Sequence, residues 1–515
     1  SCRGELVEPI EVSGHFPTDG VVLTDRNMGG DKTIDVAPGH YEVIFSRGIE
    51  YSIDRQFVEV LRGREHRMIG SVHRQVDTRG FVSADFHIHS EGSPDSAVEI
   101  RERVASFAAE GVEFLSSSDH DNLRDFEPAI RELGLQHWMT SQVGIETSPL
   151  MLGHLLGFPV DYDATQPQRM PQETAYDWYL ATPDELIESI RNMGTLHGEK
   201  DALVIFAHVY DYFNYYGLNP FTLNLGSTLF FTLGAEPLFN PDLFSGNFDG
   251  FEVLNGKSLD YVHRPTVREL RTYNEGLVAL ADRLRSGQLT YRDYSSEHMA
   301  LGASTIASFL ERTEAEQNAF YGTSTGVECA CLGTDDCAAD GAGDDEPCND
   351  TTFRGVAEDW MRMMNRGVFK AAVANSDTHG LYHAEAGMPR NFVAYGSDIP
   401  RHIRPDDLDQ AVRERRVVGS SGPFIRFTVN DEGVGGTVVS PPDGRVTLKI
   451  EVQSPTWFDV DRVQVFRNGE LLKSFDGCTE EGGECIEQPN IKVMNLNVSF
   501  DDEPGRDAWY AVSAA

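Results

Sequence analysis

From residue 80 onwards, apolar runs and amphipathic stretches alternate, and this alternation restricts the possible folds more than any other feature. Four apolar residues recur at helical spacing before Gly111, which is placed to end that helix: Ile100, Val104, Phe107 and Ala108. We expect strands at 112–116, 142–146, 154–160, 203–207, 251–254 and 371–374. We expect helices at 125–133, 183–193 (with Thr182 as N-cap), 267–284 and 358–365. Repeated strand–helix units predict a βα barrel or a doubly wound sheet.

Histidines and acidic residues stand where these strands would end. Three runs contain most of them: Asp85-Phe86-His87-Ile88-His89, Ser118-Asp119-His120-Asp121 and Asn375-Ser376-Asp377-Thr378-His379. His87 and His89 are two positions apart, so on a strand both imidazoles point to one face and can bind one metal ion. Glu146 and His208 end two further apolar runs, and His154 follows Glu146 by eight positions. Each residue alone could be an ordinary polar residue. Because strand ends converge on one mouth in a βα barrel, the whole pattern predicts a hydrolytic metal site.

Taken together, these motifs resemble those of the PHP (polymerase and histidinol phosphatase) superfamily of metallohydrolases. The matching segments are D-x-H-x-H-S at 85–90, S-D-H at 118–120, G-x-E at 144–146, A-H at 207–208 and N-S-D-x-H at 375–379. The Gly153-His154 step, the segment 252–256 and the flanking β-rich regions are more similar to the carbaryl-hydrolase-like branch. The resemblance covers most of 80–424, and it indicates the superfamily more specifically than the substrate.

The resemblance implies a distorted (β/α)7 TIM-like barrel with two or three divalent metal ions, often Zn, Mn or Fe. The first ion would be held by His87, His89, Glu146 and Asp377. The second, which Glu146 would bridge to the first, would be completed by His154 and His208. The third would be held by Asp95, His120 and His379. Many family members have a histidine in place of Asp95, so the third site could be weak or empty. Asp119 would orient a ligand histidine.

The chain has 515 residues, which is too long for one hydrophobic core, so two or three domains are expected. We predict an N-terminal β-sandwich at 1–79, the barrel at 80–423 and a C-terminal β-sandwich at 424–515. The flanking predictions rest on short β-rich runs at 21–23, 41–45, 56–60, 446–452, 460–466 and 498–500, with Asn468-Gly469 as a hairpin turn. Two insertions interrupt the barrel, an aromatic one at 211–247 and a Cys/Asp-rich one at 316–356. Either could form a lid or pocket wall, and the aromatic residues could equally serve packing alone.

A metal-dependent hydrolase is the function that these patterns predict, because a bound metal lowers the pKa of water to about 7 and supplies hydroxide. The leading hypothesis is a phosphoesterase that acts on phosphomonoesters or phosphodiesters. The alternatives are a hydrolase of aryl carbamates, esters or amides, and a non-catalytic surface lipoprotein that binds metal or ligand. Further catalytic candidates, which could equally be surface or packing residues, are Tyr210, Lys257, Arg264, His383 and Arg390. The acidic stretch 335–346 could bind Ca²⁺, although it lacks the ordered spacing of an EF-hand.

Charge and cysteine usage bear on partners and compartment. The chain has 82 acidic and 43 basic residues and a formal net charge of −39, which argues against nucleic-acid binding. We expect a small-molecule substrate and predict no protein partner. Two local groups of cysteines predict disulfides in an oxidising compartment: Cys329, Cys331, Cys337 and Cys348 in one loop, and Cys478 and Cys485 near the C-terminus. A structural zinc site is the alternative for the first group.

The N-terminal residues suggest a location. Ser1 precedes Cys2, and a polar stretch at 3–8 follows, which resembles the mature end of a bacterial lipoprotein. On this interpretation the protein is exported, either secreted or held in the periplasm or at the outer surface by a membrane tether through lipidated Cys2. The alternative is that Cys2 has no such role.

Overall fold

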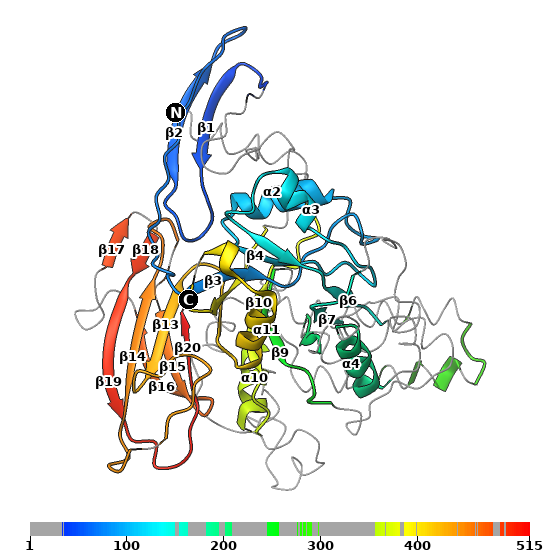
Figure 1. Cartoon of the computed structure of the whole chain (residues 1–515), viewed down its shortest axis with the longest axis vertical. Coiled ribbons are helices and arrows are strands. Elements are labelled where there is room, and N and C mark those ends of the chain that lie inside the picture. Colours follow the sequence, from blue (N-terminus) through cyan, green and yellow to red (C-terminus); the bar gives the residue numbers. More distant parts are fainter. Residues whose placement is uncertain are drawn as a thin grey trace.

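The structure is a computed structural model of the chain. It describes residues 33–149, 154–162, 182–194, 201–208, 245–256, 356–381, 386–476 and 485–514, apart from a few isolated positions, and scattered positions between 276 and 297. The described part is a mixed α/β structure with several sheets and few helices. Figure 1 shows a central body of mixed sheets, a β-rich layer beside it and one strand pair that extends away from it.

Two five-stranded sheets form the central body. The first has the order β10 (Ala371–Asn375), β9 (Gly250–Asn255), β8 (Leu203–Phe206), β7 (Leu155–Phe158) and β6 (Ile145–Thr147). The second has the order β12 (Val417–Ser420), β11 (Arg390–Ala394), β3 (Phe81–Asp85), β4 (Phe114–Ser116) and β5 (Thr140–Gln142). Both sheets are mixed, because β8, β9 and β10 run parallel while β6, β7 and β8 alternate, and because β11 pairs antiparallel with both β3 and β12.

The two sheets meet without a continuous ladder. Single parallel bridges join Ile88 to Thr378 and His120 to Glu146. The side chain of Asn391 on β11 accepts a hydrogen bond from the backbone N–H of Ala374 on β10 and donates one to its carbonyl, at 2.8 and 2.6 Å. Among the described residues the strands of the predicted seven-stranded barrel form two adjoining mixed sheets, and these sheets do not close into a barrel.

The strand predicted at 142–146 is two strands, β5 and β6, which belong to different sheets. The chain passes between them at Gly144, where a Cβ atom would lie 2.5 Å from both Ser116 Oγ and the Ser117 carbonyl. Only glycine fits this close approach of two backbones. The passage places Glu146 at the seam between the sheets.

Helices cover the outer faces of the sheets. They are α2 (Ile100–Ala109), α3 (Glu127–Glu132), α4 (Pro183–Asn192), α10 (Val356–Asn365), α11 (Pro405–Arg413) and the short 3-10 helix η6 (Pro400–His402). Thr182 caps α4 as predicted, in a capping box with Glu185. Val104 and Phe107 of α2 pack with Ile130 of α3 in one buried cluster. No helix in the described part of the chain has the length and hydropathy needed to cross a bilayer. The predicted helix 267–284 lies largely outside the described residues.

The flanking regions are built from antiparallel strands. β1 (Gly39–Phe45) pairs with β2 (Asp54–Val60), and the run 21–23 lies outside the described residues. In the C-terminal region β13 (Phe424–Val429), β14 (Val446–Gln453) and β19 (Leu496–Asp502) form one sheet. A second consists of β16 (Glu470–Asp476), β15 (Arg462–Arg467) and β20 (Tyr510–Ala514), and a third pairs β17 (Cys485–Gln488) with β18 (Ile491–Met494). Asn468 and Gly469 have positive φ and form the predicted turn between β15 and β16.

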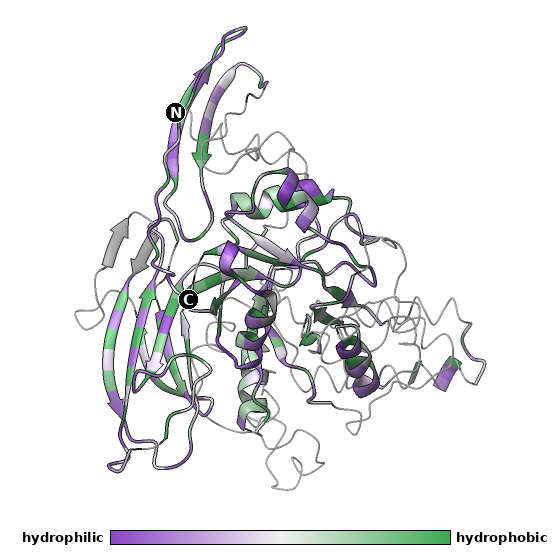
Figure 2. Cartoon of the chain, viewed as in Figure 1, coloured by the Kyte–Doolittle hydropathy of each residue, from purple (hydrophilic) through white to green (hydrophobic). Residues whose placement is uncertain are grey.

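The first two C-terminal sheets share one apolar core. Leu448 and Ile450 of β14 pack in the same buried cluster as Val463 and Val465 of β15. Buried and exposed residues alternate along β14, and Figure 2 shows the matching alternation of hydropathy in this layer. This is the pattern of two sheets packed face to face. The division of the chain into three domains remains a prediction.

Candidate metal centre

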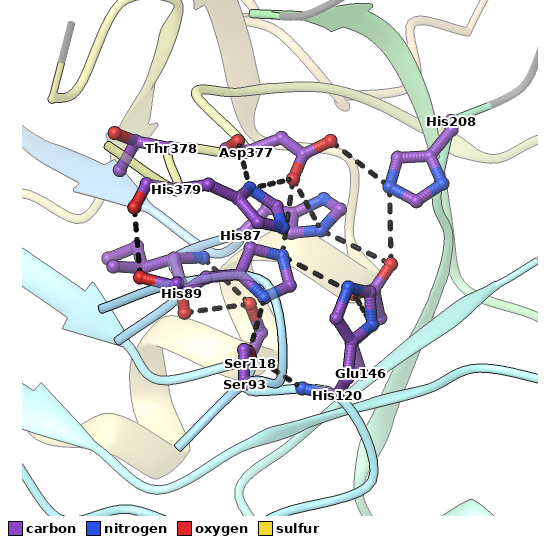
Figure 3. Close-up of polar contacts among 12 residues, drawn as sticks. His87, His89, Ser93, Ser118, His120, Glu146, His208, Asp377, Thr378 and His379 are labelled. Atoms are coloured by element: carbon purple, nitrogen blue, oxygen red, sulfur yellow. Dashed lines mark hydrogen bonds and ion pairs between the residues drawn. The ribbon is translucent and has the colours of Figure 1, made fainter. Parts of the chain in front are cut away.

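The structure brings all nine predicted ligand residues together at the seam between the two mixed sheets. They are His87, His89, Asp95, His120, Glu146, His154, His208, Asp377 and His379, and each belongs to at least one group whose ligand atoms lie within 4.8 Å of one another. Most of them lie in or just beyond the C-terminal ends of β3, β4, β6, β8 and β10, whereas His154 directly precedes β7. Figure 3 shows the imidazoles around two carboxylates, with His208 approaching from a different side than the others.

Glu146 is the centre of the cluster, and its two oxygens face different sets of histidines. Oε1 lies 3.3 Å from His87 Nε2 and 3.2 Å from His208 Nε2. The same oxygen is 2.8 Å from His154 Nδ1. Oε2 lies 3.3 Å from His89 Nε2 and 2.8 Å from His120 Nδ1. A carboxylate placed in this way can bridge two metal ions.

Asp377 faces the same cluster from β10. Its Oδ1 lies 3.4 Å from His87 Nε2 and 3.2 Å from His89 Nε2, while Oδ2 lies 3.1 Å from His208 Nε2. Asp377 and His208 both have positive φ, at 50° and 38°, which is uncommon for residues other than glycine. Hydrogen bonds from the Asp377 N–H to the His87 carbonyl and from the His208 N–H to Glu252 hold these conformations. Strained backbone of this kind is often found at functional sites.

The residues fit metal ions by two measures. Ligand atoms about 2.1 Å from a tetrahedral metal ion lie about 3.4 Å apart, and the nitrogen–oxygen separations around Glu146 and Asp377 are close to that value. In addition, His87 Nε2 and His89 Nε2 are buried and make no hydrogen bond to any described residue. A buried ring nitrogen without a hydrogen bond is costly in a protein interior, and a metal ion would use its lone pair.

Asp95, His120 and His379 form an outer group with His89. Asp95 Oδ2 lies 3.4 Å from His120 Nε2 and 3.0 Å from His379 Nε2. The Asp95 side chain is 51% exposed, whereas His87, His89, Glu146 and Asp377 are fully buried. The outer group therefore faces solvent, and the inner one does not.

The charges of the cluster shift the pKa values of its members strongly. Although burial favours the neutral imidazole, Glu146 and Asp95 raise the pKa of His120 to about 10. Burial likewise opposes the charged form of His87, but Asp377, Glu146 and Glu252 raise its pKa well above 6.5. Burial lowers the pKa of His89 well below 6.5. Burial opposes ionisation of Glu146 too, yet the surrounding histidines hold its pKa well below the usual range.

Two further buried residues support the cluster, and no role for either of them was predicted from the sequence. Glu252 on β9 accepts hydrogen bonds from His87 Nδ1 at 3.1 Å, from the His208 N–H at 2.7 Å and from the side chains of Asn255 and Asn375. A carboxylate on Nδ1 turns Nε2 of the imidazole towards the metal side. The sequence signal that could have revealed Glu252 is an acidic residue inside an otherwise apolar strand. The segment 252–256 was used at that point only for its family resemblance.

Arg103 on α2 is the other supporting residue. Its guanidinium is fully buried and donates to the His89 carbonyl at 2.8 Å, and to Thr378 Oγ1 and the Gly380 carbonyl at 3.1 Å each. It thereby fixes two loops that carry ligand residues. The positive charge also lies near Asp119 and Asp85, which offsets part of the negative charge collected here.

The remaining catalytic candidates divide into two kinds. Arg390 is fully buried and donates hydrogen bonds to the carbonyls of Gly387 and Glu110. These contacts are explained by a structural role, and a catalytic role stays a prediction. The other candidates lie outside the described residues: Tyr210, Lys257, Arg264 and His383. So do the acidic stretch 335–346, most of both insertions, Cys2, the four loop cysteines and Cys478.

Comparison with known proteins adds no family assignment. No protein-family model matches the chain, and no curated protein is significantly similar to it. The identification with the PHP superfamily therefore depends on the motifs quoted above. The structure establishes that buried histidine and acidic clusters at the sheet seam could hold metal ions.

Proposed function

We propose that this protein is a metal-dependent hydrolase whose site holds two or three divalent cations. The observation that carries the proposal is the position of Glu146, which is fully buried and lies between two sets of histidine nitrogens. One oxygen faces His87, His154 and His208, and the other faces His89 and His120. Glu146 belongs to two separate groups of possible ligands, one with His87 and His208 and the other with His120 and His154, and a single ion would use only one of these groups.

Charge supports more than one cation. Five carboxylates are fully or almost fully buried in or beside this seam: Asp85, Asp119, Glu146, Glu252 and Asp377. Burying carboxylates without compensating charge is expensive, and Arg103 alone offsets little of it. Burial raises the pKa of Asp85 to about 7, which relieves part of the repulsion, while Glu146 and Asp377 keep their charge. Divalent cations would balance the remainder.

The exposed side of the cluster determines where a substrate can approach. The side chains of His120, His154 and His379 are 15%, 21% and 12% exposed, and Asp95 is half exposed. The inner residues are sealed from solvent. When bound, the metal ions would lower the pKa of water and polarise the scissile group. The chain's own residues would hold the reacting group at the rim formed by Asp95, His120 and His379.

The assignment of a closed barrel fold is also a proposal. We infer that the two mixed sheets are the wall of one distorted (β/α)7 barrel of the PHP type. The bridges Ile88–Thr378 and His120–Glu146 support it, because they join β3 to β10 and β4 to β6 where a barrel would close. Both bridges include or adjoin ligand residues, so the same contacts that would complete the barrel also position the site.

We propose phosphoesters as the substrates, on the basis of the motif resemblance and of a site suited to several cations. The test begins with the bound transition metals per chain, measured on purified protein. Cleavage of p-nitrophenyl phosphate, bis(p-nitrophenyl) phosphate and 1-naphthyl carbamates is then assayed after reconstitution with Zn²⁺, Mn²⁺ or Fe²⁺. We expect metal-dependent cleavage of at least one phosphate ester.

Two other outcomes would change the assignment. Cleavage of the carbamates without any phosphate ester would overturn the phosphoesterase proposal and leave a carbamate, ester or amide hydrolase. Absence of bound metal, with no hydrolysis after reconstitution, would favour a non-catalytic binding protein.

A further inference from the structure

Ser93 lies beneath His89 in the view of Figure 3, and its hydroxyl has three polar neighbours. Ser93 Oγ is 2.9 Å from His89 Nδ1 and 2.8 Å from Asp119 Oδ1, and it accepts a hydrogen bond from the His120 N–H at 3.0 Å. Ser93 is 4% exposed, and Asp119 and His89 are fully buried. No motif had pointed to Ser93.

The proton positions in this network follow from what each group can do. A hydroxyl has one proton and two lone pairs. The His120 backbone N–H can only donate, so it takes one lone pair. The Asp119 carboxylate can only accept when ionised, and it already accepts from the N–H and hydroxyl of Ser90, so the Ser93 proton goes to Asp119.

One lone pair then remains for His89 Nδ1, which must carry a proton to use it. In a neutral imidazole the other nitrogen is unprotonated. That nitrogen, Nε2, faces Glu146 and Asp377 and has no hydrogen bond to any described residue. The network thus leaves His89 with its lone pair on the metal side.

We propose that Ser93 is a positioning residue that, held by Asp119, fixes the tautomer of His89 and anchors the backbone of His120. This inference rests on the proposed function in that it concerns the same metal centre. It also refines the role expected for Asp119, which contacts no ligand imidazole directly but acts through the Ser93 hydroxyl. The close fit extends to Gly92, where a Cβ atom would lie 2.6 Å from Asp119 Oδ2.

A purely structural role is the competing explanation, and Ser118 provides a matched control for it. Ser118 is also a buried serine near the cluster, and its hydroxyl accepts from the Ile88 N–H at 2.7 Å. It contacts backbone rather than a ring nitrogen of a ligand histidine. Ser118→Ala therefore removes a comparable buried hydroxyl without changing the partner of His89 Nδ1.

The experiment has two readouts on the full chain. The first is the ¹⁵N NMR signature of the His89 ring in metal-free protein, assigned by the signals that His89→Gln removes. The second is the Zn²⁺ dissociation constant, measured by competition with a chelator. Both are recorded for the wild type, Ser93→Ala, Ser93→Thr and Ser118→Ala.

We expect a protonated Nδ1 and unprotonated Nε2 in the wild type, in Ser93→Thr and in Ser118→Ala. Ser93→Ala should show mixed or reversed tautomers and about 10- to 100-fold weaker Zn²⁺ binding, the usual effect of losing a partner of a ligand histidine. A wild-type His89 protonated on Nε2 would overturn the proposal without any variant. Equal losses of affinity in Ser93→Ala and Ser118→Ala, with the tautomer unchanged, would also overturn it. If the wild type binds no metal, the proposed function fails, while the tautomer measurement still decides the role of Ser93.

Discussion

The ligand cluster at the sheet seam and the C-terminal pair of sheets use buried space in opposite ways. At the seam, the inner ligand residues His87, His89, Glu146 and Asp377 occupy positions with no solvent exposure, and they contact one another. In the C-terminal sheets the buried positions are apolar. Two charged pairs there, Lys449 with Asp431 and Arg445 with Glu503, lie at the surface, and a third, Arg467 with Asp502, is partly exposed. The first arrangement is costly without bound cations, whereas the second is stable through apolar burial alone.

This difference shows where to look for function when a sequence matches no family model. A regular alternation of buried and exposed residues, as along β14, is fully explained by packing. Buried histidines and carboxylates that are gathered from five separate strand ends are not explained in that way. The two regions should therefore respond differently to the same kind of mutation, and the following changes test that contrast.

The largest effect is expected from Asp377→Ala. Asp377 faces four histidine nitrogens, so its removal should eliminate at least one bound metal ion and reduce turnover by about 10³-fold or more. Metal content by elemental analysis and hydrolysis rates measure it. Asp501→Ala is the control in the C-terminal sheets, where the exposed carboxylate accepts from Thr447 Oγ1, and both quantities should stay at wild-type values. A fully active Asp377→Ala would refute the metal assignment.

Leu448→Ala tests the apolar region. Leu448 is fully buried in the C-terminal core, and truncation of such a residue costs about 2–5 kcal/mol. We expect a lower free energy of unfolding for this region in denaturant titrations, with unchanged metal content in the folded protein. Val439→Ala is a matched control, because Val439 is 88% exposed and its truncation should cost less than about 0.5 kcal/mol. Metal loss in Leu448→Ala would show that the two regions are coupled.

Glu252→Gln tests the support of His87. The amide keeps the shape of the carboxylate but removes its charge and half of its accepting capacity, which four hydrogen bonds now use. We expect metal affinity to fall by about 10- to 100-fold with little change in overall fold. Chelator competition measures the affinity, and far-UV circular dichroism checks the fold. Wild-type affinity in Glu252→Gln would mean that His87 is oriented without this carboxylate.

The pH dependence of metal binding follows from the pKa of His120, which is raised to about 10 in the metal-free protein. A metal ion binds the neutral ring, so below pH 10 binding must displace a proton. Affinity should therefore rise at least tenfold per pH unit between pH 7 and 9, because His87, whose pKa is also raised, can lose a further proton on binding, and it should level off once both rings are neutral. Calorimetry in buffers of different ionisation enthalpy measures the protons released. His120→Gln should release about one proton fewer than the wild type, and equal release would exclude His120 as a ligand.

The sequence predicted the ligand set better than the residues that support it. His87, His89 and Asp377 were accessible because strand periodicity and strand ends are local features. Their partners are not local, since Glu252 reaches His87 across 165 positions of the chain. Ser93 is even less visible from sequence, because a serine in a loop carries no periodic pattern. Its importance depends on the side chains that tertiary packing places around it.

The sheet order shows the same limit. Short apolar runs predicted most strands, and yet β5 and β6 read as one strand because nothing in residues 142–146 shows that the chain changes sheets at Gly144. The strands β11 and β12 were not predicted, and the antiparallel pairing of β11 with both β3 and β12 makes the second sheet mixed. Pairing partners are chosen by tertiary contacts, which propensity alone does not specify.

Asp95 is the site at which the smallest effect is expected, because it belongs to the exposed side of the cluster. Its carboxylate contacts only His120 and His379 among the ligand residues, and solvent screens it. Asp95→Ala should weaken the most weakly bound ion about tenfold and slow turnover a few-fold, while the inner ions remain bound. Asp95→His, which introduces the residue common in the family that the motifs resemble, should bind that ion at least as tightly as the wild type. Metal stoichiometry across a chelator titration separates the inner and outer ions. Loss of all bound metal in Asp95→Ala would show that the exposed and buried halves form one cooperative site.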